Sequence, residues 1–176
     1  MNQTECKTCG RLKKVTRVVS MTLLVLFLGS YVYSYASIFS DVGMSVVATY
    51  IDTENENVMR AVEVITENCK YMDDSYFRED CLIVGTENWV LLNIGNDLHM
   101  TPPSLPQSPA LTSELGEGNC VDKAIFTASI LKALKVSKVF LVSQKQHMCV
   151  LVQSGKIGFK FLNCLPHADT LAVKRV

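Results

Sequence analysis

The chain has 176 residues, and its 17 lysines and arginines balance its 17 aspartates and glutamates. This length allows one compact domain with additional segments. The neutral balance gives no argument for nucleic-acid binding, and no basic stripe with interleaved aromatic residues occurs in the body of the chain, so we expect no nucleic-acid partner. The hydrophobic fraction of 48% is high for a soluble protein of this size, and the excess lies near the N-terminus.

Residues 18–40 form an uncharged apolar stretch, VVSMTLLVLFLGSYVYSYASIFS. As a helix, such a stretch is long enough to cross a hydrocarbon core of roughly 30 Å. Basic residues precede it and acidic residues follow it, so the positive-inside rule places the N-terminus in the cytoplasm and the remainder outside. We therefore predict a short basic cytoplasmic segment over 1–17 and a single-pass transmembrane helix over 18–40 in contact with membrane lipid. A cleaved signal peptide is the alternative, although the stretch is long for one.

The seven cysteines fall on both predicted sides of the membrane. Cys6 and Cys9 form a C-x-x-C pair on the cytoplasmic side, which is either half of a zinc site or two reduced thiols. The other five lie outside: Cys69, Cys81, Cys120, Cys149 and Cys164. Because five is odd, at least one of them stays unpaired or pairs between chains. An oxidising exterior favours a disulfide between Cys69 and Cys81, which closes a short loop, but the sequence does not fix the pairing.

The segments before residue 114 give mixed signals. Residues 54–69 have apolar positions at helical spacing, which predicts a helix. Residues 71–81 are polar and loop-like, and 82–95 are either helix or strand, because the apolar run is too short to decide. Residues 98–113 contain four prolines within eight positions, which predicts an extended, exposed segment.

The signals after residue 114 are clearer. Gly116 and Gly118 indicate a turn, Asn119 is a good N-cap residue, and an apolar stripe at helical spacing begins at Val121. Three strands follow, over 138–144, 147–153 and 157–163. A helix followed by an antiparallel sheet predicts an α+β fold rather than an alternating α/β fold.

Cys120 stands in the first turn of this predicted helix. Backbone N–H groups and the positive end of the helix dipole point there, and both favour a thiolate over a thiol. A nucleophilic cysteine also needs a nearby base, and the base usually needs an orienting group. His147 opens the second predicted strand and Asn163 closes the third, so both are candidates for these roles.

The turn between these two strands decides whether the candidates meet. A three-residue loop over 154–156 pairs residues whose numbers add to 310, so that His147 faces Asn163 and Cys149 faces Phe161. The Asn163 side chain can then accept a hydrogen bond from one imidazole nitrogen and leave the other for the thiol. A two-residue loop gives the wrong parity. We therefore predict a catalytic triad of Cys120, His147 and Asn163.

These motifs resemble the core of the transglutaminase-like superfamily, whose members share a papain-like cysteine-protease core. The resemblance covers about 50 residues, 116–165, and rests on a Gly-x-Cys-x-Asp-x-Ala helix entry, a strand that begins with His, and a polar residue about sixteen positions later: Gly118, Cys120, Asp122, Ala124, His147 and Asn163. The segment from Cys69 to Cys81 also resembles archaeal membrane-anchored members. The resemblance implies that 41–176 is a transglutaminase-like domain, with the nucleophile helix packed on a small antiparallel sheet.

The implied function is that of a membrane-anchored, thiol-dependent peptidase, amidase or acyltransferase acting on a peptide or protein substrate. Cys120 would attack an amide carbonyl, His147 would take and return the proton, and an acyl-enzyme would form. The backbone N–H of Cys120 would be one oxyanion-hole donor, and the sequence identifies no second donor. We expect no cofactor and no metal ion.

Two departures from the family pattern leave alternatives open. Asn163 stands where the family has Asp, and the proline-rich segment replaces the expected tryptophan-containing motif. Both favour a catalytically inactive domain that serves as an extracytoplasmic binding or structural module. A cysteine endopeptidase of a different papain-like family has the same order of residues. A zinc site is a fourth reading, although the spacing of its candidate ligands matches no usual pattern: Cys120, His147, Cys149 and Cys164.

Overall fold

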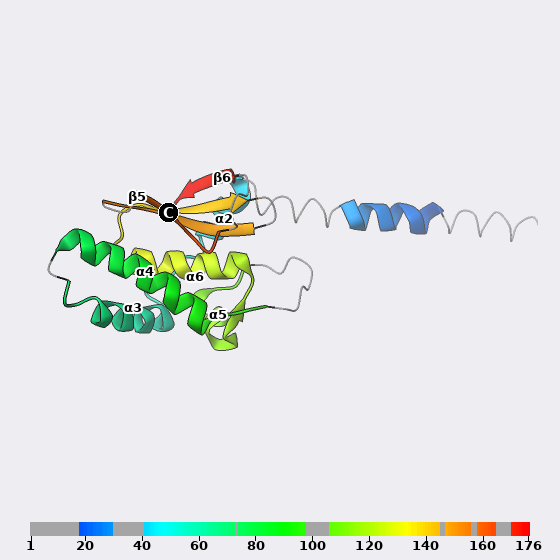
Figure 1. Ribbon diagram of the computed structural model, residues 1–176. Coiled ribbons are helices and arrows are strands. Elements are labelled where there is room, and N and C mark those ends of the chain that lie inside the picture. Colours follow the sequence, from blue (N-terminus) through cyan, green and yellow to red (C-terminus); the bar gives the residue numbers. More distant parts are fainter. Residues whose placement is uncertain are drawn as a thin grey trace, which may run out of the picture. The chain divides into compact units, whose positions relative to one another are not determined.

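The computed structural model describes seven stretches of the chain: residues 18–29, 41–72, 74–97, 106–144, 147–155, 158–164 and 170–176. The chain divides into two units, Met1–Ala36 and Ser37–Val176. In the first unit a helix covers residues 18–29. The second unit is an α+β domain, as the sequence predicts, and contains every candidate site residue (Figure 1).

The prediction of a transmembrane helix over 18–40 is wrong. Within this stretch the structure describes a helix over residues 18–29. Among the described residues, no helix combines the length and the apolar character that crossing a membrane requires. The predicted cytoplasmic segment over 1–17, with Cys6 and Cys9, lies outside the described residues, as do residues 30–40.

Two helices, α3 (Glu56–Asn68) and α4 (Ser75–Asn93), cover the segments with mixed signals. Helix α3 confirms the predicted helix over 54–69 and begins after Asn55, whose side chain accepts a hydrogen bond from the N–H of Asn57. Helix α4 shows that most of 82–95, which the sequence left as helix or strand, is helical. It also begins at Ser75, so most of the loop predicted over 71–81 is helix instead. The disulfide predicted between Cys69 and Cys81 is present and ties the end of α3 to α4.

Helix α5 (Pro109–Leu115) corrects the extended segment predicted over 98–113. Pro109 occupies the first turn, where a missing N–H is harmless and a fixed φ suits a helix. The side chain of Ser108 caps it by accepting from the N–H of Leu111. Residues 98–105 lie outside the described residues. A further helix, α2 (Asp41–Ala48), precedes α3 and has no clear sequence signal.

The main sheet has the strand order β5-β4-β3-β6, with antiparallel neighbours throughout. Strands β3 (Val139–Gln144), β4 (His147–Ser154) and β5 (Gly158–Leu162) confirm the three predicted strands. Strand β6 (Thr170–Arg175) adds an edge that the sequence did not predict. Two short parallel strands, β1 (Gly95–Asn96) and β2 (Glu117–Gly118), form a second sheet before helix α6 (Cys120–Ala133).

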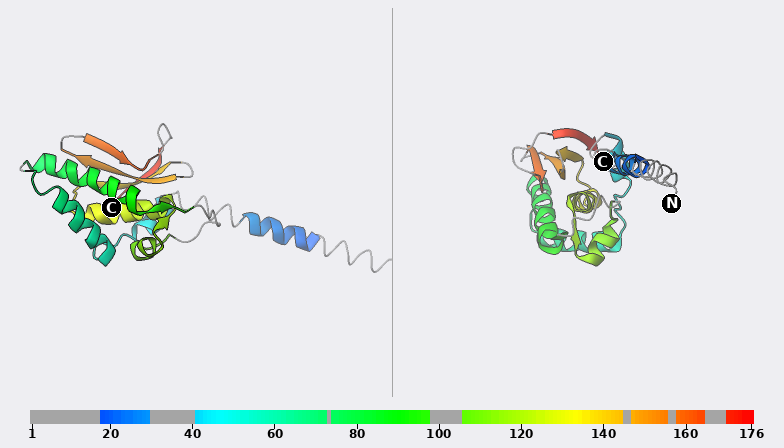
Figure 2. Two further views of the ribbon diagram at one scale, coloured as in Figure 1. Left: turned by 60° about the horizontal axis from the view of Figure 1, so that its bottom comes forward. Right: turned by 90° about the vertical axis from the view of Figure 1, so that its right-hand side faces the viewer.

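Helix α6 lies at the centre of the domain (Figures 1 and 2). One side of it packs under the sheet through Val121 and Ile125, and the other side packs against α3 and α4 through Phe126 and Ile130. The Phe126 ring stacks on Trp89 of α4, with the ring centroids 5.7 Å apart. Ten of the eleven positions from Val121 to Leu131 are buried, all except Lys123, so α6 is a central helix rather than a surface helix with one apolar face.

Strands β4 and β5 form the predicted hairpin with a register two residues away from the prediction. Val150 pairs with Leu162 and Ser154 with Gly158, so partner numbers add to 312 rather than 310. The parity is the predicted one, but the pairings expected for His147 with Asn163 and for Cys149 with Phe161 do not occur. Phe161 pairs with Leu151 instead, and the described ladder ends before Asn163.

Candidate active site

Cys120 is the first residue of α6, and a reciprocal cap fixes this helix start. The Asn119 side-chain oxygen accepts hydrogen bonds from the N–H groups of Val121 and Asp122, at 2.8 and 3.1 Å. In return, Asp122 Oδ2 accepts from the N–H of Asn119 at 3.0 Å. This capping box satisfies three of the N–H groups that a helix start leaves without partners. It therefore holds the thiol at the positive end of the α6 dipole.

The turn before Cys120 is also held by close contacts. A Cβ atom on Gly118 would lie 3.0 Å from Asp122 Cβ and 3.2 Å from Thr112 Cγ2, so a larger residue would have to push these side chains away. The other carboxylate oxygen of Asp122 accepts from the N–H of Gln107 at 2.8 Å. Burial raises the pKa of the Asp122 carboxyl, although its two N–H partners oppose the rise. Asp122 is thus a structural residue, which completes the cap of α6 and holds Gln107 beside it.

His147 is the first residue of β4, and its imidazole lies close enough to the Cys120 thiol for each side chain to shift the pKa of the other. Its Nε2 atom lies 2.6 Å from the backbone oxygen of Asn163. A carbonyl oxygen only accepts, so Nε2 must carry a proton and donate it. Nδ1 is then the nitrogen left for the thiol. The structure therefore brings Cys120 and His147 together. It also fixes the tautomer of His147 in which Nδ1 is free to take the proton of the thiol.

The electrostatics favour a charge-separated pair. Burial raises the pKa of Cys120, but the hydrogen bond with His147 and the N–H groups of Met148 and Val121 outweigh it, so the pKa lies below that of an ordinary thiol. The hydrogen bond with Cys120 raises the pKa of His147, and the Asn163 carbonyl adds to the rise against the opposing effect of burial. Both shifts favour thiolate and imidazolium over thiol and neutral imidazole.

The N–H of Cys120 has no hydrogen-bond acceptor among the described residues, whereas the N–H groups of Asn119, Val121, Asp122 and Lys123 each have one. An N–H without an acceptor is available to donate a hydrogen bond to a carbonyl that the nucleophile attacks. The assignment of this N–H as the first oxyanion donor stays a prediction. The described residues give no second donor, which the sequence also left unassigned.

Asn163 takes part in the site through its main chain, not its side chain. The residue has φ 56, in the left-handed region that asparagine tolerates better than most residues. Its side-chain nitrogen is buried and has no hydrogen-bond partner in the described part of the chain. The predicted contact between this side chain and His147 is therefore replaced by the backbone carbonyl. The physical reason is the register, which leaves Asn163 beyond the end of the β4–β5 ladder.

A second disulfide, between Cys149 and Cys164, lies next to this contact, with its Cα atoms 5.1 Å apart. The sequence left the state of both cysteines open. Because they are bonded to each other, they are not available as thiolate ligands, which removes two of the four ligands of the zinc reading. Cys120 remains as the free thiol among the described cysteines.

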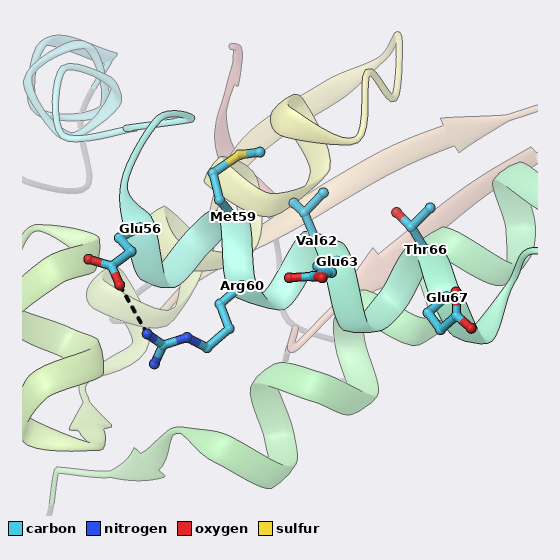
Figure 3. Close-up of a pocket in the computed structure, with 7 residues that line it drawn as sticks. All are labelled: Glu56, Met59, Arg60, Val62, Glu63, Thr66 and Glu67. Atoms are coloured by element: carbon cyan, nitrogen blue, oxygen red, sulfur yellow. Dashed lines mark hydrogen bonds and ion pairs between the residues drawn. The ribbon is translucent and has the colours of Figure 1, made fainter.

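The described pocket lies elsewhere, on the outer face of α3 (Figure 3). Seven residues of this one helix line it, and an exposed ion pair joins two of them, Glu56 and Arg60, at 3.1 Å. The lining residues are Glu56, Met59, Arg60, Val62, Glu63, Thr66 and Glu67. None of them belongs to the site around Cys120. Their side chains carry charges of both signs and do not form an arrangement that resembles a catalytic site.

Comparisons of the chain with protein-family models, with curated proteins and with solved structures found no match. The resemblance to the transglutaminase-like superfamily therefore stays a prediction that rests on the residues between 116 and 165.

Proposed function

We propose that the protein is a thiol-dependent hydrolase of peptide or other amide bonds, with Cys120 as the nucleophile and His147 as its acid–base partner. The observation that carries this proposal is the proximity of Cys120, at the start of the buried helix α6, to His147, at the start of β4, whose Nε2 is held by the Asn163 carbonyl. A thiol paired with an oriented imidazole is the arrangement that activates a cysteine nucleophile.

The reaction follows from the positions of the two side chains. The Cys120 sulfur forms a bond to the carbonyl carbon of the substrate, and the C–N bond breaks as His147 gives its Nδ1 proton to the leaving amine. Water then attacks the thioester, with His147 taking one of its protons and returning it to the departing sulfur. An amine in place of water would give acyl transfer, but water is the default acceptor.

The backbone around the site supports the same chemistry. The N–H groups of Met148 and Val121 lower the pKa of Cys120, and the N–H of Cys120, which has no acceptor among the described residues, would donate to the oxyanion. The carbonyl of Asn163 stabilises the imidazolium form of His147. These groups act where charge develops in the reaction, which is the feature that separates a catalytic pair from a buried cysteine that only fills space.

The test is the pH dependence of Cys120 alkylation by iodoacetamide in the full chain. We expect fast labelling at neutral pH, with an apparent pKa below the unperturbed value of about 8.5, and we expect both to be lost in His147→Ala. Cys120→Ser serves as the blank, and His99→Ala, which changes a histidine outside the described residues, is the matched control. Slow labelling that does not depend on His147 would contradict the proposal.

That contrary result would favour the alternative of an inactive binding or structural module. The observation on its side is that the Asn163 side chain does not contact His147, so the predicted third side chain of the triad is missing. The alkylation test separates the two readings, because a module without chemistry has no need of a reactive thiolate.

A further inference from the structure

The Cys149–Cys164 disulfide encloses the contact that orients His147. Cys149 lies two residues after His147 in β4, and Cys164 directly follows Asn163. The described pairing between β4 and β5 stops at Val150 and Leu162. Beyond that pair, the disulfide is the covalent connection between the strand that carries His147 and the segment that carries the Asn163 carbonyl.

The place of this carbonyl depends on main-chain position rather than on the identity of a side chain. Asn163 is outside the β4–β5 ladder and in the left-handed region, and its own side-chain nitrogen has no partner among the described residues that would anchor it. A single-residue turn of this kind needs another restraint to hold its carbonyl 2.6 Å from His147 Nε2. The bond from the next residue, Cys164, to the neighbouring strand supplies that restraint.

We propose that the Cys149–Cys164 disulfide is a positioning element that makes the reactivity of Cys120 depend on redox state. When the disulfide is formed, it holds the Asn163 carbonyl at His147 and keeps the imidazole directed at the thiol. When it is reduced, the segment after β5 is released, His147 loses its orienting acceptor, and Cys120 becomes a slower nucleophile. This inference rests on the proposed function, because it describes the regulation of the same site.

The redox step needs a dithiol reductant. One thiolate of the reductant attacks a sulfur of the Cys149–Cys164 bond and forms a mixed disulfide, and its second thiol then displaces the protein sulfur. The reductant ends as a cyclic disulfide, and Cys149 and Cys164 each end as a thiol. The reverse reaction with an oxidised dithiol restores the bond.

The chain contains a matched control for this experiment. The Cys69–Cys81 disulfide joins α3 to α4 and contacts neither Cys120 nor His147 in the described interactions. The variant Cys69→Ser/Cys81→Ser removes it and keeps the positioning disulfide, and Cys149→Ser/Cys164→Ser does the opposite. Digestion with trypsin and a glutamate-specific protease releases residues 118–123, which contain Cys120 alone among the cysteines, so mass spectrometry follows this thiol without interference.

We expect Cys149→Ser/Cys164→Ser to lower the alkylation rate of Cys120 at pH 6.5 by about ten-fold or more, since a shift of one pKa unit changes the thiolate fraction ten-fold below the pKa. The pH profile should move toward that of an ordinary thiol, whereas Cys69→Ser/Cys81→Ser should leave rate and profile unchanged. If the wild-type rate depends on His147 but survives the loss of Cys149 and Cys164, the inference is wrong and the proposed function stands. If the wild-type rate is already indifferent to His147, the proposed function fails.

The variant Cys149→Ser/Cys164→Ser could fail to fold. Reduction of the folded Cys69→Ser/Cys81→Ser protein opens the same Cys149–Cys164 disulfide without that substitution. We expect a dithiol to slow the labelling of Cys120, and re-oxidation to restore it, at an unchanged far-ultraviolet circular dichroism spectrum. In the same protein carrying His147→Ala, reduction should not change the rate, because the disulfide acts through the imidazole. Equal rates in the reduced and oxidised protein with His147 present would overturn the inference.

Discussion

Replacement of Asn163 by glycine distinguishes a main-chain role from a side-chain role at the third position of the site. The structure orients His147 by the backbone oxygen of Asn163, at 2.6 Å from Nε2. Asn163→Gly keeps that oxygen and removes the whole side chain. We therefore expect the alkylation rate of Cys120 in Asn163→Gly to stay close to the wild-type rate, and well above that of His147→Ala.

The expected change in stability follows from the backbone conformation of Asn163. A residue with a Cβ atom pays about 1–2 kcal/mol in the left-handed region, which glycine avoids, so Asn163→Ala should be less stable than Asn163→Gly by roughly 1 kcal/mol. Both variants also remove a buried amide nitrogen that has no partner among the described residues. This removal offsets part of the entropy cost of about 0.5–1 kcal/mol that glycine brings. Asn163→Gly should therefore unfold at nearly the wild-type urea concentration.

The assay combines urea unfolding, followed by circular dichroism, with alkylation of Cys120 across pH. Asn163→Ala is the matched control, because it removes the same side chain and differs only in its backbone preference. If Asn163→Gly is folded but labels as slowly as His147→Ala, then the side chain orients the imidazole, and the reasoning from the backbone carbonyl is refuted.

Three further predictions follow from the same geometry. Gly118→Ala should lower the free energy of unfolding by about 1–3 kcal/mol in urea, because its Cβ would lie 3.0 Å from Asp122 Cβ; wild-type stability would contradict this. Asp122→Ala should cost a similar amount, about 1–3 kcal/mol, since it leaves the N–H groups of Asn119 and Gln107 without their acceptor; the check is again urea unfolding. The rate of amide hydrolysis should rise with pH as Cys120 loses its proton, at a lowered pKa, and should fall again as His147 loses its proton, at a raised pKa. A rate that begins to rise only near the ordinary thiol pKa of about 8.5 would contradict this order.

The part of the site that the sequence predicts well is encoded locally. Asn119 is a strong N-cap residue, Asp122 stands at the reciprocal position of the capping box, and an apolar run follows, so the start of α6 is specified within a few residues. The same holds for the strands, whose lengths and β-branched content are visible without tertiary information. Cys120 could therefore be assigned to a helix N-terminus from the sequence alone.

The register of the β4–β5 hairpin shows where local information ends. The predicted loop over 154–156 and the observed ladder, which closes at Ser154 and Gly158, both leave three residues between the strands. A shift of two residues also keeps every side chain on its face of the sheet. Met148, Val150 and Val152 stay buried in either register, so the apolar pattern cannot choose between them. The contacts of Asn163 depend on that choice.

The helices missed in the sequence have a different cause. The prolines over 98–113 predict an extended segment, but Pro109, at the first turn of α5, favours the helix. The polar residues over 71–81 predict a loop, whereas α4 begins at Ser75. In both cases the outcome depends on where a residue falls within a helix or on tertiary packing, and neither is visible in a window of residue types.

Most of the groups that tune the candidate pair are main-chain groups: the N–H of Met148, the N–H of Val121 and the carbonyl of Asn163. Such groups are placed by the fold and carry no signature in residue type, so a search for side chains finds the cysteine and the histidine and misreads the third position. What position 163 requires is a residue that accepts φ near 56, a condition that asparagine, aspartate and glycine all meet. Asparagine at this position therefore meets the requirement of the backbone, and its side chain is not needed to place the carbonyl that His147 contacts.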